Sequence, residues 1–339
     1  MNRTQWADGL DVTVPQDITD PQAAVDSVRM RAAFTDRAPA SSRLPFSYQS
    51  IPLPVRTMIG DVIGRVQRRR VQRWAAFPRW PLDLSADYVA DLRGAAPSPF
   101  AGGPTPVLLS HDIDTAEGLK NLIPHFLPLE ESAGARSANY VVPCGWPIDH
   151  ALLEEAAARG HEIGIHGYDH SNKTPFASDA ERKLRIEAAR PLVQRYGITG
   201  YRAPSLVRTK ALLRDLEGLY RYDASIPTSG GLFPVPNNGC ASARPFRIGN
   251  LIEIPLSLPR DGSLRFLGHD PDDILEIWKQ CAQTIAASGG VVSLLTHCED
   301  RFSGNEAMLS AYRRFLDYLA ADGRYVFSTT AQILQRLGG

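Results

Sequence analysis

The chain has 339 residues, of which 43% are hydrophobic and 22% charged, a composition typical of a soluble globular protein with a large core. Its 37 basic and 37 acidic side chains balance, so the overall charge does not indicate nucleic acid or an anionic surface as a partner. Four widely separated cysteines form no Cys-x-x-Cys pair, which argues against a disulfide framework or a zinc knuckle and favours the reducing cytoplasm. We expect no signal peptide and no transmembrane segment, because the first residues lack an apolar core and no apolar run approaches roughly 20 residues.

Residues 1–103 differ from the rest of the chain, because they contain neither Lys nor Glu and are rich in proline. Apolar residues at helical spacing predict a helix from Val55 to about Trp74, whose other face carries a row of arginines. Two interpretations of these arginines stay open. They form a patch for anionic lipid or a phosphorylated substrate, or they form the solvated face of a helix that packs on the main domain.

Aromatic and apolar residues follow this helix among prolines, and such side chains need an apolar surface to cover them. They are Trp74, Phe77, Trp80 and Leu84. We therefore predict that residues 1–103 are a mostly helical or irregular extension that packs on the remaining domain and shapes one wall of its substrate site. The proline- and glycine-rich stretch 96–104 is the predicted linker between the two.

In residues 104–339, strand and helix patterns alternate. Strands are predicted at 107–110, 137–142, 162–166, 199–202, 222–226, 251–256, 290–297 and 325–328. Helices are predicted near 117–122 and at 149–159, 178–195, 208–219, 271–287 and 305–321. The alternation predicts an α/β domain with a mostly parallel sheet, nearer a closed barrel than an open sheet, with its chemistry where the strands end.

Two carboxylates follow the first of these strands, in the sequence Ser110-His111-Asp112-Ile113-Asp114-Thr115. Side chains two apart on an extended strand share a face, so Asp112 and Asp114 should point the same way. Such a pair forms a metal or acid–base site, or it merely caps the following helix. Partners elsewhere in the chain decide between these two interpretations.

Three further signals also close predicted strands. His166 and His170 have a spacing that puts both imidazoles on one face if the segment turns helical, and two histidines with one carboxylate suit a hydrolytic metal site. Arg202 could grip a carboxylate with two hydrogen bonds, or it could form an ordinary surface ion pair. His297 ends an apolar strand, as a core residue or as part of a shared rim. The other five histidines, His111, His125, His150, His161 and His269, are predicted to be structural or exposed.

These signals, in this order and each after a strand, resemble the polysaccharide deacetylase family, the NodB-homology carbohydrate esterases. The resemblance covers roughly residues 104–339. It implies a distorted (β/α)7 barrel and a divalent metal, zinc by default, bound by Asp114, His166 and His170. It also implies a general base, Asp112, oriented by Arg202, and a general acid, His297.

The sequence departs from the family pattern in three places. Typical members carry adjacent aspartates, whereas one residue separates them here, a variant similar to intracellular members such as the lipid-linked formamido-arabinose deformylase and the allantoinase branch. Ser205 replaces the usual Tyr after the Arg-x-Pro motif. The acid that normally supports the last histidine is not obvious, and Asp261 and Glu253 are both candidates.

We therefore predict a cytoplasmic, metal-dependent hydrolase that removes an N-acyl group, acetyl by default, from an acetamido sugar in glycan or cell-envelope biosynthesis. The sugar could be nucleotide-linked or lipid-linked, and a peripheral membrane contact and the oligomeric state are left open. Two alternatives remain: a C–N hydrolase of a small cyclic amide or ureide, and a barrel that binds glycan without catalysis. A mere binder would not need a base, an acid and a metal together, which argues against the last alternative.

Overall fold

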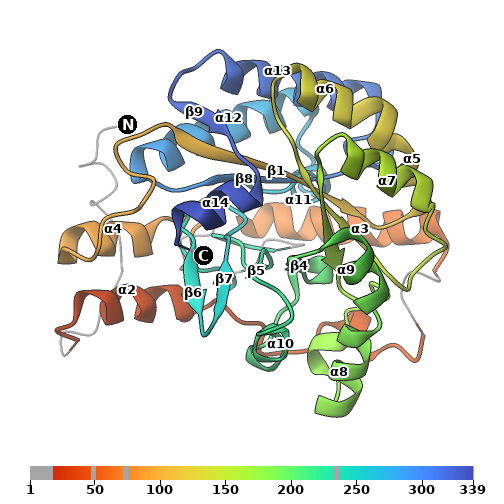
Figure 1. Cartoon of the computed structure of the whole chain (residues 1–339), viewed down its shortest axis with the longest axis horizontal. Coiled ribbons are helices and arrows are strands. Elements are labelled where there is room, and N and C mark those ends of the chain that lie inside the picture. The colour runs from red at the N-terminus through yellow and green to blue at the C-terminus, as the bar shows by residue number, and fades with distance from the viewer. Residues whose placement is uncertain (1–17, 47–50, 72–75, 232–234, 236, 339) are drawn as a thin grey trace.

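The computed structural model describes residues 18–46, 51–71, 76–231, 235 and 237–338. A nine-stranded sheet lies at the centre of the described chain, with helices around it (Figure 1). The sheet order is β6-β7-β5-β4-β3-β2-β1-β8, and β9 pairs with the opening residues of β1. All strand pairs are parallel except β6 with β7. Within the described residues, no helix is long and apolar enough to cross a membrane.

The strands are short and mostly buried, as expected for a parallel sheet covered on both faces. They are β1 (Thr105–Ile113), β2 (Ala138–Val141), β3 (Glu162–His166), β4 (Gly200–Arg202), β5 (Tyr222–Asp223), β6 (Phe246–Ile248), β7 (Leu251–Glu253), β8 (Val292–His297) and β9 (Tyr325–Phe327). Every predicted strand is present, although several are shorter than predicted. The strand β6 was not predicted, because its three residues have only one buried side chain and thus a weak apolar pattern.

The chain after β7 bridges the gap between β7 and β8. The Leu258 N–H donates to the Ser293 carbonyl at 3.0 Å, and the Ser293 N–H donates to the Ser257 hydroxyl at 2.7 Å. Inside the resulting distorted barrel, Leu108 of β1 belongs to a buried cluster that includes Tyr140 and Tyr222. This arrangement confirms the predicted α/β fold with a distorted (β/α)7 barrel.

Helical segments follow β1 between and after the strands of the barrel. They are α5 (Ala116–Asn121), the π-helical turn η3 (Leu122–Phe126), α6 (Leu127–Ser132), α7 (His150–Ala158), η4 (Thr174–Phe176), α8 (Asp179–Glu187), α9 (Arg190–Tyr196), η5 (Pro204–Leu206), α10 (Lys210–Leu216), α11 (Asp261–Phe266), α12 (Pro271–Ser288), α13 (Glu306–Ala320) and α14 (Thr330–Arg336). A single helix over 178–195 was predicted, but the helix is interrupted between α8 and α9. Pro191 explains the break, because it has no N–H to bond back to the Glu187 carbonyl.

In the described residues before the barrel, the helical segments are α2 (Pro21–Met30), η1 (Ala40–Arg43), α3 (Leu53–Val71) and α4 (Ser85–Arg93). The helices α2 and α4 lie side by side and share a small apolar cluster (Figure 1). The buried carboxylate of Asp87 in α4 accepts hydrogen bonds from Ser242 and Ala243 of the barrel domain. The described part of the extension is thus tied to the barrel by buried polar contacts.

Residues after α3 also contact the barrel and the α2–α4 cluster, through apolar side chains. Trp80 packs against the main core and Leu84 belongs to it, while Phe77 packs on the α2–α4 cluster. Trp74 lies outside the described residues. The predicted linker is irregular but anchored, because the Ser98 hydroxyl donates to the Gly289 carbonyl at 2.6 Å and Phe100 is buried under the barrel.

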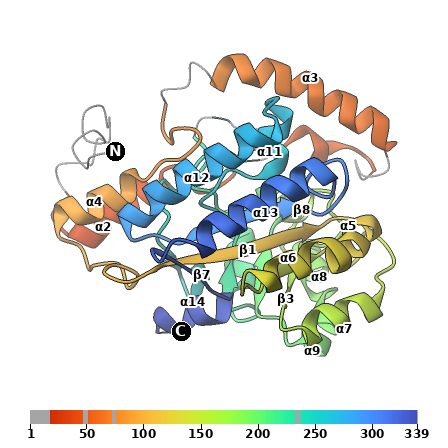
Figure 2. The same cartoon turned by 90° about the horizontal axis from the view of Figure 1, so that it is seen from above.

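The helix α3 confirms the predicted helix as far as Val71, but it presents a different face to the barrel from the one that its apolar pattern suggests. Gly60 and Gly64 lie against Phe266 of α11, and a Cβ atom on Gly64 would come within 1.9 Å of the Phe266 carbonyl oxygen. Six apolar residues of α3, from Val55 to Val66, are instead exposed. In Figure 2 the helix lies along the outer edge of the molecule, beyond α11.

Candidate metal centre and active site

The strand register collects the predicted site residues at the carboxyl edge of the barrel. In β1, Asp112 is the Cα partner of His297 in β8. In β3, His166 is the Cα partner of Arg202 in β4. Because all four strands are parallel and end at the same rim, side chains far apart in sequence face one another.

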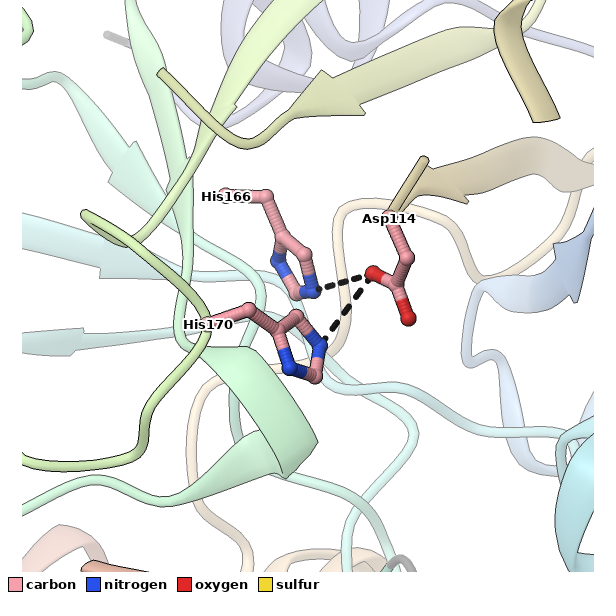
Figure 3. Close-up of side chains that lie close together, drawn as sticks. All are labelled: Asp114, His166 and His170. Carbon is pink, nitrogen blue, oxygen red and sulfur yellow. Dashed lines mark ion pairs between the residues drawn. The ribbon is translucent and has the colours of Figure 1, made fainter. Parts of the chain in front are cut away.

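A possible metal centre lies at this rim (Figure 3). The carboxylate oxygen Oδ1 of Asp114 lies 3.4 Å from Nε2 of His166 and 3.2 Å from Nε2 of His170. All three residues are buried, and their donor atoms lie within 4.8 Å of one another. Burial alone would raise the pKa of Asp114, but His170 and His166 hold it well below the usual Asp value.

The donor set fits a first-row divalent cation. Two ligand atoms about 2.0–2.1 Å from a tetrahedral ion lie roughly 3.3 Å apart, close to the two distances in this cluster. Asp114 Oδ1 and His166 Nε2 are buried atoms without a hydrogen-bond partner. The other ring nitrogen of His166, Nδ1, lies 3.0 Å from the Arg202 carbonyl oxygen, which fixes the ring and leaves Nε2 free to bind a metal.

The segment that joins the two histidines is not helical, contrary to the interpretation of their spacing. Gly167, His170 and Asn172 all have positive φ angles, of 69°, 58° and 62°. The tight loop has a steric reason, because a Cβ atom on Gly167 would lie 2.4 Å from the Pro204 ring. The imidazoles converge through this loop, with ring centroids 5.1 Å apart.

Asp112 lies beside the three possible metal ligands and is held by a buried arginine. Arg202 Nη1 donates to Asp112 Oδ1 at 3.0 Å, and Nη2 donates to the Ser110 hydroxyl at 2.9 Å. The guanidinium also lies 4.0 Å above the Tyr140 ring. Burial favours the neutral form of Asp112, but His166, Arg202 and His297 together lower its pKa. Asp112 is therefore an oriented, ionised carboxylate, suited to accept a proton.

His297 lies at the same rim and is supported by Asp261 at the start of α11. His297 Nδ1 lies 2.8 Å from Asp261 Oδ1, and the His297 N–H donates to Oδ2 at 2.7 Å. Burial opposes the charged imidazole, but Asp261 outweighs it and raises the pKa of His297 to about 9. Of the two candidate supporting acids, Glu253 lies elsewhere and accepts from the Ile226 N–H.

Glu299 is a further buried carboxyl group at this rim that sequence reasoning missed. The Thr115 hydroxyl donates to Glu299 Oε1 at 2.8 Å, and Oε2 has no hydrogen-bond partner. Burial, followed by the charge of Asp114, raises the pKa of Glu299 to about 7. Glu299 lies two residues beyond the end of β8, outside the strand, so strand alternation did not indicate its orientation.

Asn172 links the site loop to the N-terminal extension. Its amide nitrogen lies 3.2 Å from the Ser205 hydroxyl and 3.1 Å from the Ser41 hydroxyl in η1. Its Oδ1 atom is buried without a hydrogen-bond partner. Ser205 has a positive φ of 54°, so η5 turns sharply at this point. Asn172 therefore connects Ser41 of the extension to Ser205, which follows the Arg202 strand, through two hydrogen bonds.

The other five histidines lie outside this constellation. His111 points away from the barrel interior and contacts Glu130, Thr296 and Tyr312. His161 lies beside the same Glu130. These buried polar contacts are consistent with the structural roles predicted for both histidines.

Comparison with known proteins places this geometry on a known fold. No protein-family model and no curated protein matches the sequence. Two solved structures assigned as polysaccharide deacetylases are similar. The one from Mycobacterium smegmatis has 20% identity and a TM-score of 0.56, over 72% of this chain and 94% of the other. The one from Pseudomonas aeruginosa PAO1 has 15% identity and a TM-score of 0.55, over 76% of this chain and 97% of the other.

A PuuE allantoinase structure is similar as well, with 17% identity and a TM-score of 0.59, over 76% of this chain and 97% of the other. At these identities the similarity establishes the fold and leaves the reaction open. The expected resemblance is confirmed at that level: the chain has the polysaccharide deacetylase fold.

Proposed function

We propose that this chain belongs to the polysaccharide deacetylases by function as well as by fold, and that it is a metal-dependent hydrolase of an N-acyl group on an acetamido sugar. The observation that carries the proposal is the convergence of three units at one rim. These are the Asp114–His166–His170 cluster, the Asp112–Arg202 pair and the Asp261–His297 pair. Together they offer a cation site, a proton acceptor and a proton donor, which amide hydrolysis requires.

Asp114, His166 and His170 would hold the cation, zinc by default, although the donor set accepts other first-row ions. When bound, the cation would supply Lewis acidity that polarises the amide carbonyl and lowers the pKa of a water molecule. Asp112 accepts the proton of the attacking water. The hydrogen bond from Arg202 orients the Asp112 carboxylate and favours its ionised form. A backbone N–H near Ser205 is our candidate for binding the developing oxyanion.

His297 completes the reaction by protonating the departing amine. The amine is a poor leaving group without that proton, so the tetrahedral intermediate would otherwise return to substrate. A pKa of about 9 keeps the imidazole protonated at neutral pH. The reaction therefore needs no covalent intermediate with the protein.

Two measurements test the proposal. Elemental analysis should find a divalent metal in the wild type and lose it in the His166→Ala/His170→Ala variant. A screen of N-acyl sugars, free, nucleotide-linked and lipid-linked, should show release of acetate or formate that depends on the same metal. Equal metal content in both proteins would refute the metal centre, and metal-dependent binding without acyl release would favour a glycan-binding barrel.

A C–N hydrolase of a small cyclic amide or ureide is the second candidate. It is favoured by the structural similarity to the PuuE allantoinase and by the single residue between Asp112 and Asp114. The same metal, base and acid would serve it. Adding cyclic amides and ureides to the acyl-sugar screen separates the two candidates directly.

The remaining parts of the proposal concern organisation and setting. We assign residues 1–103 to an extension that shapes one wall of the substrate site, supported by the contact of Ser41 with Asn172. Residues 104–339 form the catalytic barrel. A cytoplasmic setting, in glycan or cell-envelope biosynthesis, is supported by four cysteines that all remain free thiols.

A further inference from the structure

The outer face of α3 concentrates apolar side chains in an unusual way. Six of the eleven exposed large hydrophobic side chains in the described part of the chain lie on this one helix. They are Val55, Met58, Ile59, Val62, Ile63 and Val66, each 37–61% exposed, and we call them the α3 stripe. Scattered exposed apolar residues are normal, whereas a contiguous set marks an interaction surface.

The spacing of the stripe is that of one helix face, with positions i, i+3, i+4, i+7, i+8 and i+11 counted from Val55. The helix cannot rotate to bury the α3 stripe against α11. On the opposite face, Gly60 and Gly64 touch Phe266, and a Cβ atom on Gly60 would lie 2.5 Å from the Phe266 ring. The glycines therefore fix the helix against α11 and direct the stripe outward.

Positive charge borders and extends the stripe. Arg65 is exposed at its edge, and Arg69 and Arg70 follow Val66 by one turn on the same face, so the prediction that the arginines lie on the opposite face was wrong for these two residues. The single acidic residue of α3, Asp61, lies 3.7 Å from Arg265 of α11. The uncompensated charge of this helix face is therefore positive, and its natural complement is an anionic surface.

We propose that α3 docks the protein on an anionic lipid bilayer. The stripe would enter the boundary between head groups and acyl chains, and Arg65, Arg69 and Arg70 would contact lipid phosphates. An interfacial helix needs this combination of an apolar stripe with flanking arginines. Pro54, Thr57, Met58, Asp61, Val62 and Arg65 of α3 line a shallow, open surface on this side of the helix.

The charge pattern argues against a second copy of the chain as the occupant. Two α3 stripes packed on each other would bring the arginines of both helices together, with only Asp61 to offset them. A protein partner would also be expected to meet aromatic anchors, and α3 has none. The proposal does not depend on the hydrolase reaction, since the α3 stripe includes none of the metal-cluster residues.

Sedimentation of the full-length protein with vesicles tests the proposal. We expect binding to vesicles of phosphatidylcholine mixed with phosphatidylglycerol, weaker binding to phosphatidylcholine alone, and a loss of binding as salt is raised. Ile59→Ser/Val62→Ser should abolish binding. Leu184→Ser is the matched control, because Leu184 on α8 is 68% exposed but lies outside the stripe.

A second pair of variants tests the charge. Each arginine near an anionic surface contributes about 1 kcal/mol, or about five-fold in affinity, so Arg69→Gln/Arg70→Gln should weaken binding about 25-fold. Arg221→Gln/Arg247→Gln removes two exposed arginines elsewhere and should leave binding unchanged. All variants alter exposed positions, and thermal unfolding should confirm that each is folded.

Three results would overturn the proposal. The first is no binding of the wild type to anionic vesicles, which would point to an acidic protein as the partner. The second is unchanged binding by Ile59→Ser/Val62→Ser. The third is a dimer in light scattering, without vesicles, that this variant abolishes, because the stripe would then be covered by a second copy.

Discussion

Replacement of Asp261 by Asn should move the pH range in which the protein is active. The Asp261 carboxylate is buried and accepts hydrogen bonds from Nδ1 and the backbone N–H of His297, from the Ser303 hydroxyl and from the Gly262 N–H. Its charge raises the pKa of His297 to about 9. Asp261→Asn keeps the shape of the side chain and removes that charge.

The size of the effect follows from the protonated fraction of His297. Without the carboxylate, the largest cause that raises the pKa of His297 is lost, and we take the ordinary His value of about 6.5 for the variant. A general acid works only when protonated, so activity is lost as pH rises through this pKa. At pH 7.5 the protonated fraction would fall from about 0.97 to about 0.09, a loss of roughly ten-fold, whereas at pH 6 the loss would be below about two-fold. A bound cation lowers both pKa values but preserves the direction of the change.

The assay is kcat/KM for the acyl substrate from about pH 5.5 to about pH 9.5, with metal content measured in parallel. The basic limb of the profile should move to lower pH in Asp261→Asn. Ser303→Ala is the matched control, because it removes one hydrogen bond to the same carboxylate and leaves the charge in place. An unmoved basic limb in Asp261→Asn, with normal metal content, would show that His297 is not the acid or that Asp261 does not control it.

Four other changes have distinct expected outcomes. Asp112→Asn should retain metal and lose about 10²–10⁴-fold in turnover, and a near-normal rate with metal bound would remove Asp112 as the base. Asp114→Asn should weaken metal binding itself, which elemental analysis would detect. Cys298→Ser should be nearly silent in turnover, because adjacent strand residues point apart, and an inactive, folded, metal-replete variant would contradict this. Deletion of residues 1–103 should yield an insoluble or inactive barrel, and a soluble, fully active product would disprove the packing role of the extension.

The rim residues could be identified from sequence because a parallel barrel places its strand ends together. Asp112, His166, Arg202 and His297 each close an apolar run, and one topological rule brings the four to one place. Strands β1 to β5 pair consecutively and in parallel, as expected for strands joined by helical crossovers. The pairs β1–β8, β1–β9 and β5–β7 join strands that are not consecutive, and β6–β7 is antiparallel, so these pairs do not follow from the same rule.

Other features depended on contacts that sequence spacing does not encode. Asp261 reaches His297 from the first turn of α11, 36 residues away in the chain, so no local pattern indicated the pair. The loop from His166 to His170 adopts left-handed backbone angles that a simple i, i+4 pattern cannot reveal. The apolar residues of α3 predicted a buried face, but close packing of Gly60 and Gly64 against α11 determined the orientation instead.

Three of the carboxylates at the rim, Asp112, Asp114 and Asp261, have different partners, and the difference accounts for their proposed roles. Asp112 faces the permanently charged guanidinium of Arg202, so it stays ionised and available as a base. Asp261 interacts with His297 and accepts hydrogen bonds at both oxygens. It therefore stabilises the protonated form of His297 and has no oxygen free for a metal ion. Asp114 faces two imidazoles through Oδ1, which lies 3.4 and 3.2 Å from their Nε2 atoms and is buried without a hydrogen-bond partner. A buried carboxylate left in that condition is costly in the folded protein unless a cation compensates it, which is why we assign the metal to Asp114.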